Sequence, residues 1–262
     1  MKFRVRLLGT GPSQGVPSLG GADETGDWGA CDPLDPRNRR FRSSALITAG
    51  DGTRLLIDPG PDIRAQLLAA GVARLDGVLV THSHADHVLG LDEMRAVNRV
   101  IGRELPLFAT AETLESLRVR FDYCFLPPTR GFYRPCLAAE TVAPGDTLTI
   151  GGLRLTIFEQ DHHVMTTLGL RVGDFAYCTD VVRLPQGSLA ALAGIDTWVV
   201  DCFQRQPHPV HAHLGQVLDW VTRLRPRRTI LTHMSNGLDH EALAAELPTG
   251  IEPGVDGMEL SF

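Results

Sequence analysis

Lysine is almost absent from this chain of 262 residues: Lys2 is the only one, and arginine supplies the rest of the positive charge. The net charge is −6 at pH 7, so the chain lacks the basic field that a protein gripping a long nucleic acid usually presents. We therefore expect no strong nucleic-acid binding. A local exception is the cationic run at residues 37–42.

Paired cysteines and long apolar runs are missing too. The five cysteines are scattered, odd in number and never spaced as Cys-x-x-Cys, which favours a reducing compartment, by default the cytoplasm. No apolar run reaches the length of a membrane span, so we expect no membrane partner. The first eight residues alternate between polar and apolar, which indicates a strand and not a signal peptide.

The length and an apolar content of 43% suit one globular domain spanning residues 1–262. Short apolar segments predict strands at 44–48, 54–57, 77–80, 105–109, 147–150, 153–158, 168–172, 175–179, 198–201, 229–232 and 257–261. Amphipathic segments predict helices at 62–70, 86–100, 111–120, 189–193, 214–224 and 240–247. Each half begins with hairpins and continues with helices, which predicts an α/β (α+β) fold of two sheets with helices outside.

The densest group of titratable side chains follows the apolar run at 77–80. Three imidazoles and a carboxylate fall within six residues there, as His82, His84, Asp86 and His87. Neutral imidazole and carboxylate are the usual ligands of zinc, manganese and iron. One cation cannot easily take all four groups, so the pattern predicts two adjacent metal ions. The alternative, a polar loop without metal, would crowd titratable groups at a strand end.

An apolar strand followed by a metal-ligand residue recurs three times further along the chain, at His162, Asp180 and His233. A lone histidine at a strand end is more often structural, but four such ends in one chain favour a shared metal site. His163 directly follows His162 and is the alternative ligand at that position.

With these residues in this order, the chain resembles the metallo-β-lactamase superfamily of dinuclear hydrolases. The resemblance spans essentially the whole chain and implies a four-layer αββα sandwich. It implies one ion held by His82, His84 and His162, a second held by Asp86, His87 and His233, and Asp180 bridging both. The distance to Leu168 favours His162 over His163. Asp58 would hydrogen-bond the histidine turn.

A closer resemblance is to the phosphodiesterases that open phosphoribosyl cyclic phosphate in phosphonate breakdown. It rests on Gly9-Thr10-Gly11 with Gln14-Gly15-Val16-Pro17, on Asp201-Cys202, and on residues 231–235 and 256–259. It implies that His211 donates a proton to the leaving group, with His208 and His213 as competitors for that role or as substrate-binding residues. Asp86 would be catalytic as well as a ligand. A surface loop carrying three histidines is the alternative reading.

The chain also departs from that phosphodiesterase family. The family's structural zinc site needs a cysteine cluster and a late histidine, whereas this chain offers only Cys31 and has Asn236 at the late position. We therefore expect no structural zinc and a different physiological substrate.

The resemblance implies a hydrolase that cleaves a small, cyclic phosphodiester of a sugar or nucleotide through a hydroxide bridging two divalent ions, Zn or Mn. Arg39, Arg40 or Arg42 would pair with a substrate phosphate, unless they are salt-bridged surface residues. The alternatives are a tRNA 3′-processing endonuclease, an oxidative enzyme similar to pyrroloquinoline quinone biosynthesis protein B, and a non-enzymatic metal-binding scaffold. Since superfamily relatives often dimerise, a homodimer is a further expectation.

Overall fold

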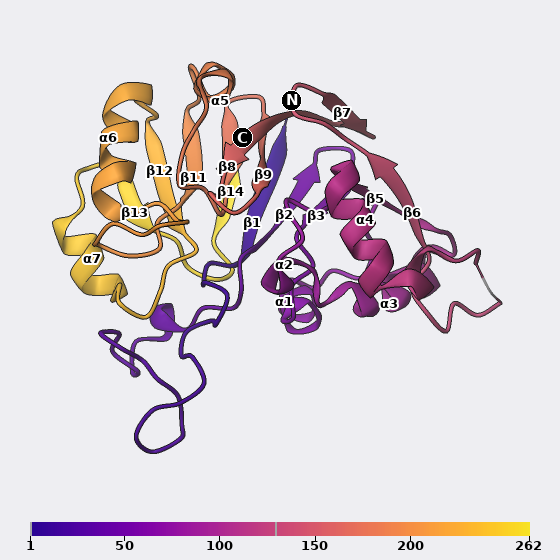
Figure 1. Cartoon of the computed structure of the whole chain (residues 1–262), viewed down its shortest axis with the longest axis horizontal. Coiled ribbons are helices and arrows are strands. Elements are labelled where there is room, and N and C mark those ends of the chain that lie inside the picture. The colour runs from indigo at the N-terminus through magenta and orange to yellow at the C-terminus, as the bar shows by residue number, and fades with distance from the viewer. Residues whose placement is uncertain (1, 129) are drawn as a thin grey trace.

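The computed structural model describes residues 2–128 and 130–262, which form two seven-stranded sheets packed face to face (Figure 1). The first sheet contains β1 (Phe3–Gly9), β2 (Ser44–Ala49), β3 (Arg54–Ile57), β4 (Gly77–Leu79), β5 (Leu105–Ala109), β6 (Leu137–Thr141) and β14 (Glu259–Ser261). The second contains β7 (Thr147–Ile150), β8 (Leu153–Asp161), β9 (Thr166–Val172), β10 (Phe175–Cys178), β11 (Thr197–Asp201), β12 (Arg228–Thr232) and β13 (Ile251–Pro253).

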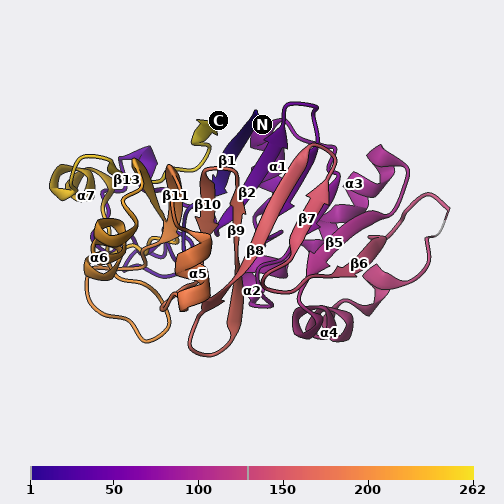
Figure 2. The same ribbon diagram turned by 90° about the horizontal axis from the view of Figure 1, so that it is seen from above.

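Helices lie on the outer faces of both sheets (Figure 2). Those of the first half are α1 (Ile63–Ala70), α2 (Ala85–Val88), α3 (Met94–Ile101) and α4 (Ala111–Arg120), with 3-10 turns at Pro36–Asn38, Leu91–Glu93 and Asp122–Phe125. Those of the second half are α5 (Gln186–Ala191), α6 (Leu214–Leu224) and α7 (His240–Glu246). Within the described residues, each helix is too short or too polar to cross a bilayer.

Both halves of the chain follow one plan. Antiparallel hairpins β1-β2-β3 lead into the parallel run β3-β4-β5-β6, and antiparallel β7-β8-β9-β10 leads into the parallel run β10-β11-β12-β13. The predicted order, hairpins first and helices after, is confirmed. Since β8, β10, β11 and β12 all run in one direction, their carboxyl ends meet at one edge of the second sheet.

Three apolar cores explain why the layers stay together. The core between the sheets joins residues such as Val5 and Ile57 to Leu155 and Tyr177. A second core packs the first sheet against α1, α3 and α4, and a third packs the second sheet against α6 and α7. Alternate residues of a central strand such as β3 therefore face different cores, since Leu55 and Ile57 belong to the core between the sheets and Leu56 to the second core. The predicted four-layer αββα sandwich is confirmed.

The prediction of one helix at 86–100 is wrong, because the segment is divided into α2, a 3-10 turn and α3. The break falls at Gly90, whose amide donates to the Pro59 carbonyl (2.9 Å). A Cβ at Gly90 would collide with the carbonyl oxygen of Gly60. Met94 and Val97 of α3 are buried, whereas Leu89, between α2 and the 3-10 turn, is exposed. Strands β6 and β13 were not predicted; each is an edge or near-edge strand.

Candidate metal centre

The histidine-rich segment lies where β4 approaches the second sheet. His82 and His84 follow β4, and His84 is the N-cap of α2, which carries Asp86 and His87 on its first turn. From the second sheet, three side chains come directly or almost directly after a strand. They are His162 after β8, Asp180 after β10 and His233 after β12. Because these residues follow the carboxyl ends of β4, β8, β10 and β12, four separate parts of the chain meet at one edge of the two sheets.

These side chains form two adjacent groups, and within each group the potential ligand atoms lie within 4.8 Å of one another. One group contains His82, His84, His162 and Asp180; the other contains Asp86, His87 and His233. A third group of the same kind, Asp180, His211 and His233, overlaps with both. The first group includes His162 and not His163. His162 is positioned by the carbonyl of Val210, 2.6 Å from its Nδ1.

Asp180 stands between the two groups. Its Oδ2 lies 3.7 Å from Nε2 of both His82 and His162. Its Oδ1 lies 3.1 Å from Nε2 of His87 and 3.4 Å from Nδ1 of His233. Each carboxylate oxygen thus faces a different group, which is the arrangement that a carboxylate bridging two cations requires.

Three buried polar atoms without hydrogen-bond partners in the described part of the chain indicate that these residues fit metal ions. Nε2 of His82, Nε2 of His87 and Oδ2 of Asp86 have no hydrogen-bond partner within the described residues. The last two lie 3.2 Å apart without forming a hydrogen bond. A buried polar atom without a partner costs about 1–3 kcal/mol, so a cation that these atoms ligate would remove the cost. The donor set, imidazole and carboxylate, fits zinc or manganese.

Asp58 positions the segment that carries the histidines through hydrogen bonds to Thr81 and a contact with His87. Its carboxylate accepts hydrogen bonds from the amide and hydroxyl of Thr81, both at 2.7 Å, and lies 2.8 Å from Nδ1 of His87. This contact with the histidine turn is the one expected from the sequence. Asp58, Asp180 and His233 all adopt left-handed backbone angles, with φ of 56°, 52° and 56°. Such angles cost non-glycine residues about 1–3 kcal/mol each, so the surrounding fold holds the centre under strain.

Burial and mutual charge keep most of the groups in the forms that bind cations. His87 is the exception, because Asp180, Asp86 and Asp58 outweigh the effect of burial and raise its pKa well above its ordinary value. Burial lowers the pKa of His82, His162 and His233, which favours neutral imidazole. Burial alone would raise the pKa of Asp180, but His233, His87 and His82 hold it well below its ordinary value. The pKa of Asp86 is lowered as well, because His87 outweighs the effect of burial. Both carboxylates are therefore ionised at neutral pH.

His211 borders the same centre, with its Nδ1 3.9 Å from Oδ2 of Asp180. The Asp201 carboxylate, at the end of β11, lies 2.9 Å from this Nδ1. Burial favours neutral imidazole, yet Asp201 outweighs it and raises the pKa of His211 to about 9. Sequence reasoning assigned no role to Asp201, although it too ends an apolar strand. Phe203 was also missed: its ring lies 5.0 Å from that of His211 and 4.7 Å from that of His208.

The other predicted substrate residues occupy different surroundings. Arg40 is buried and donates to the carbonyls of Ser235 (2.9 Å) and Leu238 (2.6 Å), so it ties its loop to the segment after β12. Arg39 lies over the Trp28 ring at 4.8 Å. Arg42 pairs with Asp62 (3.2 Å) and lines a hollow of about 510 Å³ with Gln14 and Leu19.

His213 caps α6, because its Nδ1 lies 3.4 Å from the amide of Gln216. Its imidazole is therefore engaged at the start of α6, and none of the ligand groups found among the described residues includes His213. His208 stays beside His211, with ring centres 5.3 Å apart.

Comparison with known proteins independently supports the fold described above. A family model described as the beta-lactamase superfamily domain matches residues 53–234. An octanoyltransferase of Porphyromonas gingivalis is 33% identical over 260 residues, 98% of this chain and 51% of that protein. The chain thus spans about half the length of that relative.

Two further matches extend over most of both chains. The anti-Pycsar protein Apyc1 of Bacillus phage BSP38 is 38% identical over 218 residues, 76% of this chain and 84% of that protein. The crystal structure of a new diphosphatase from the PhnP family has a TM-score of 0.90 and 33% identity, covering 100% of this chain and 98% of that one. The chain belongs to the beta-lactamase superfamily.

Proposed function

We propose that residues 1–262 form one hydrolase domain that holds two divalent ions, Zn or Mn, and cleaves a small phosphodiester. The position of Asp180 carries this proposal, since its two oxygens face the two ligand groups separately. The proposed ligands are His82, His84, His162, Asp86, His87, His233 and the bridging Asp180. The three unpartnered buried atoms support a loaded site.

Two bound divalent ions would supply a nucleophilic water at neutral pH and offset the negative charge that builds up on a phosphate oxygen. The protein's own part is orientation. Asp58 holds the His87 ring through Nδ1, and the Val210 carbonyl holds the His162 ring through Nδ1. Nε2 of each ring is therefore left to ligate an ion. We propose Asp86 as a catalytic residue through its unpartnered Oδ2, in addition to its role as a ligand.

The leaving alkoxide of a phosphodiester needs a proton, and His211 is the proposed donor. Asp201 accepts the hydrogen of Nδ1, which leaves Nε2 to carry the transferable proton. A pKa raised to about 9 keeps that proton in place at neutral pH. His208 and Phe203 lie against His211 and would restrict its motion and the access of water.

The substrate is proposed as a small cyclic phosphodiester of a sugar or nucleotide, with Arg42 and Arg39 as its proposed phosphate partners. A second candidate is a diphosphate, because the diphosphatase matches this chain over its full length. A long RNA substrate fits less well with a net charge of −6. Octanoyl transfer is not proposed, since this chain matches only 51% of the relative that bears that name.

One panel of substrates tests the proposal. The metal-loaded protein should hydrolyse bis-p-nitrophenyl phosphate and one of the 2′,3′-cyclic nucleotides or nucleoside diphosphates, and should leave precursor tRNA intact. Cleavage of the tRNA alone would replace the proposal by the endonuclease. Hydrolysis of none would favour the metal-binding scaffold. Redox turnover with only one ion bound would favour the oxidative enzyme.

We also propose a cytoplasmic location and a homodimer. All five cysteines are buried and unpaired within the described residues, which suits a reducing compartment. Sedimentation of the purified protein would decide between monomer and dimer.

A further inference from the structure

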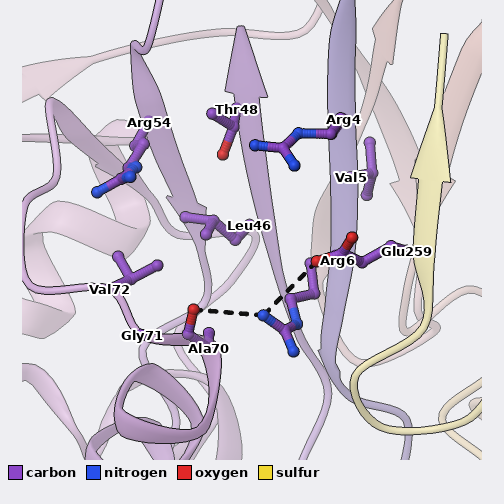
Figure 3. Close-up of a pocket in the computed structure, with 10 residues that line it drawn as sticks. All are labelled: Arg4, Val5, Arg6, Leu46, Thr48, Arg54, Ala70, Gly71, Val72 and Glu259. Carbon is purple, nitrogen blue, oxygen red and sulfur yellow. Dashed lines mark hydrogen bonds and ion pairs between the residues drawn. The ribbon is translucent and has the colours of Figure 1, made fainter.

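Three arginines line a hollow on the outer face of the first sheet, at the end of the strands away from the metal centre (Figure 3). Arg4 and Arg6 come from β1 and Arg54 from β3, and the hollow has a volume of about 170 Å³. The end of α1, from Ala70 to Val72, forms one wall. Arg54 precedes Asp58 by four residues, which is about 13 Å along an extended strand.

The strand register places the arginines in a row. Arg4 is paired with Thr48 of β2, and Thr48 is paired with Arg54. Residues that pair across strands point to the same face, so the side chains of Arg4, Thr48 and Arg54 all leave the outer face of the sheet, with Thr48 between the two arginines. With strands about 4.8 Å apart, the two arginine Cα atoms are about 10 Å from each other. Figure 3 shows the Arg4 side chain reaching across the face of the sheet toward Thr48.

The charges of this row are not balanced by the protein. Arg6 donates to the Ala70 carbonyl (3.3 Å) and lies 3.6 Å from Glu259. Within residues 2–128 and 130–262, the guanidinium groups of Arg4 and Arg54 form no ion pair or hydrogen bond, and neither does the Thr48 hydroxyl. The Asp76 carboxylate accepts from the Arg54 amide (3.0 Å) and pairs with Arg103 (3.3 Å). Two positive charges remain, in a chain whose net charge is −6.

We propose that this hollow binds a phosphate group, either as inorganic phosphate or as the phosphate of a small metabolite. A guanidinium offers two parallel N–H donors that match two oxygens of a phosphate, and a threonine hydroxyl adds a third donor. The volume suits an anion of a few heavy atoms and is too small for a helix or a strand of a partner protein. The site is separate from the metal centre and does not depend on the proposed hydrolysis.

The test is a titration of the metal-loaded full chain, labelled with ¹⁵N, while the arginine Nε–Hε signals are followed by NMR. Inorganic phosphate should shift the signals assigned to Arg4 and Arg54. Arg54→Lys keeps the charge but loses the two-pronged geometry, and should weaken the response of the Arg4 signal about tenfold. In the double variant Arg4→Ala with Arg54→Ala, the Arg6 signal from the same hollow is the reporter, and phosphate should no longer shift it. Ribose 5-phosphate is the second probe, and tighter binding than inorganic phosphate would identify a metabolite as the ligand.

Two further variants serve as controls. Arg223→Ala removes one exposed arginine from α6, so it should leave the shifts at Arg4 and Arg54 unchanged. Thr48→Val weakens binding several-fold without altering charge, should the double variant fail to fold. Phosphate that binds at the proposed metal centre should inhibit hydrolysis of bis-p-nitrophenyl phosphate. The arginine variants should leave this inhibition unchanged. If the Arg4 and Arg54 signals of the wild type stay fixed in millimolar phosphate, or if the Arg4 signal shifts equally in the wild type and in Arg54→Lys, the site does not exist.

Discussion

Nδ1 of His211 lies 2.9 Å from Oδ2 of Asp201, and this pair borders the cluster around Asp180. The carboxylate holds the imidazole in one orientation and keeps it protonated, as an orienting group does for a general acid. In the proposed mechanism Asp201 would act through His211, as a positioning residue.

Replacing Asp201 by Asn should lower kcat about tenfold or more while both metal ions stay bound. Without the carboxylate the pKa of His211 falls from about 9, so the loss of activity at high pH should move to lower pH. The comparison variant His211→Ala should lower kcat about a hundredfold and lose that pH response. An unchanged pH profile in Asp201→Asn would remove the pair from the mechanism.

Replacing Asp180 by Ala should reduce the metal content below two ions per chain, because one side chain serves both groups. Elemental analysis after dialysis measures this directly. Circular dichroism serves as the control for folding. Two ions retained in a folded variant would refute the bridge.

His162 and His163 provide a matched pair, since they are adjacent and only His162 belongs to the cluster. His162→Asn should lose one ion and nearly all turnover. His163→Asn should keep both, because asparagine tolerates the left-handed backbone that residue 163 adopts (φ 69°). The opposite outcome would exchange the two assignments.

Asp256 predicts a pH dependence of stability. Burial raises its pKa from 3.8 to about 7, although Thr10 and Phe41 donate hydrogen bonds to the carboxylate. The folded chain therefore holds this proton more tightly than the unfolded chain does. The resulting stabilisation is complete below pH 3.8 and is lost as the pH rises through 7.

Asp256→Asn removes this titration and supplies the comparison. Between pH 5 and pH 8 the free energy of unfolding of the wild type should fall relative to that of the variant, by at most about 1.4 kcal/mol per pH unit. Urea denaturation at four pH values measures the difference. Parallel curves would show that Asp256 is ionised throughout.

Much of the fold and centre could be predicted from the chain because the signals are local. A strand of period two needs only its own residues to show which face is buried, and the run from His82 to His87 places four proposed ligands within one turn and the start of one helix. The order of hairpins and helices was likewise enough to predict two sheets with helices outside.

Tertiary contacts decided the rest. Gly90 ends a helical pattern because the Pro59–Gly60 backbone occupies the space beside it, and Arg40 is buried because carbonyls from the segment after β12 surround it. Asp201 gains its role only when β11 brings it to His211, and Arg4 and Arg54 become neighbours only through β2. The periodicity of a sequence predicts which residues of a helix or strand are buried. It does not predict which distant element packs against them, and the contacts of Gly90, Arg40, Asp201 and Arg4 depend on that packing.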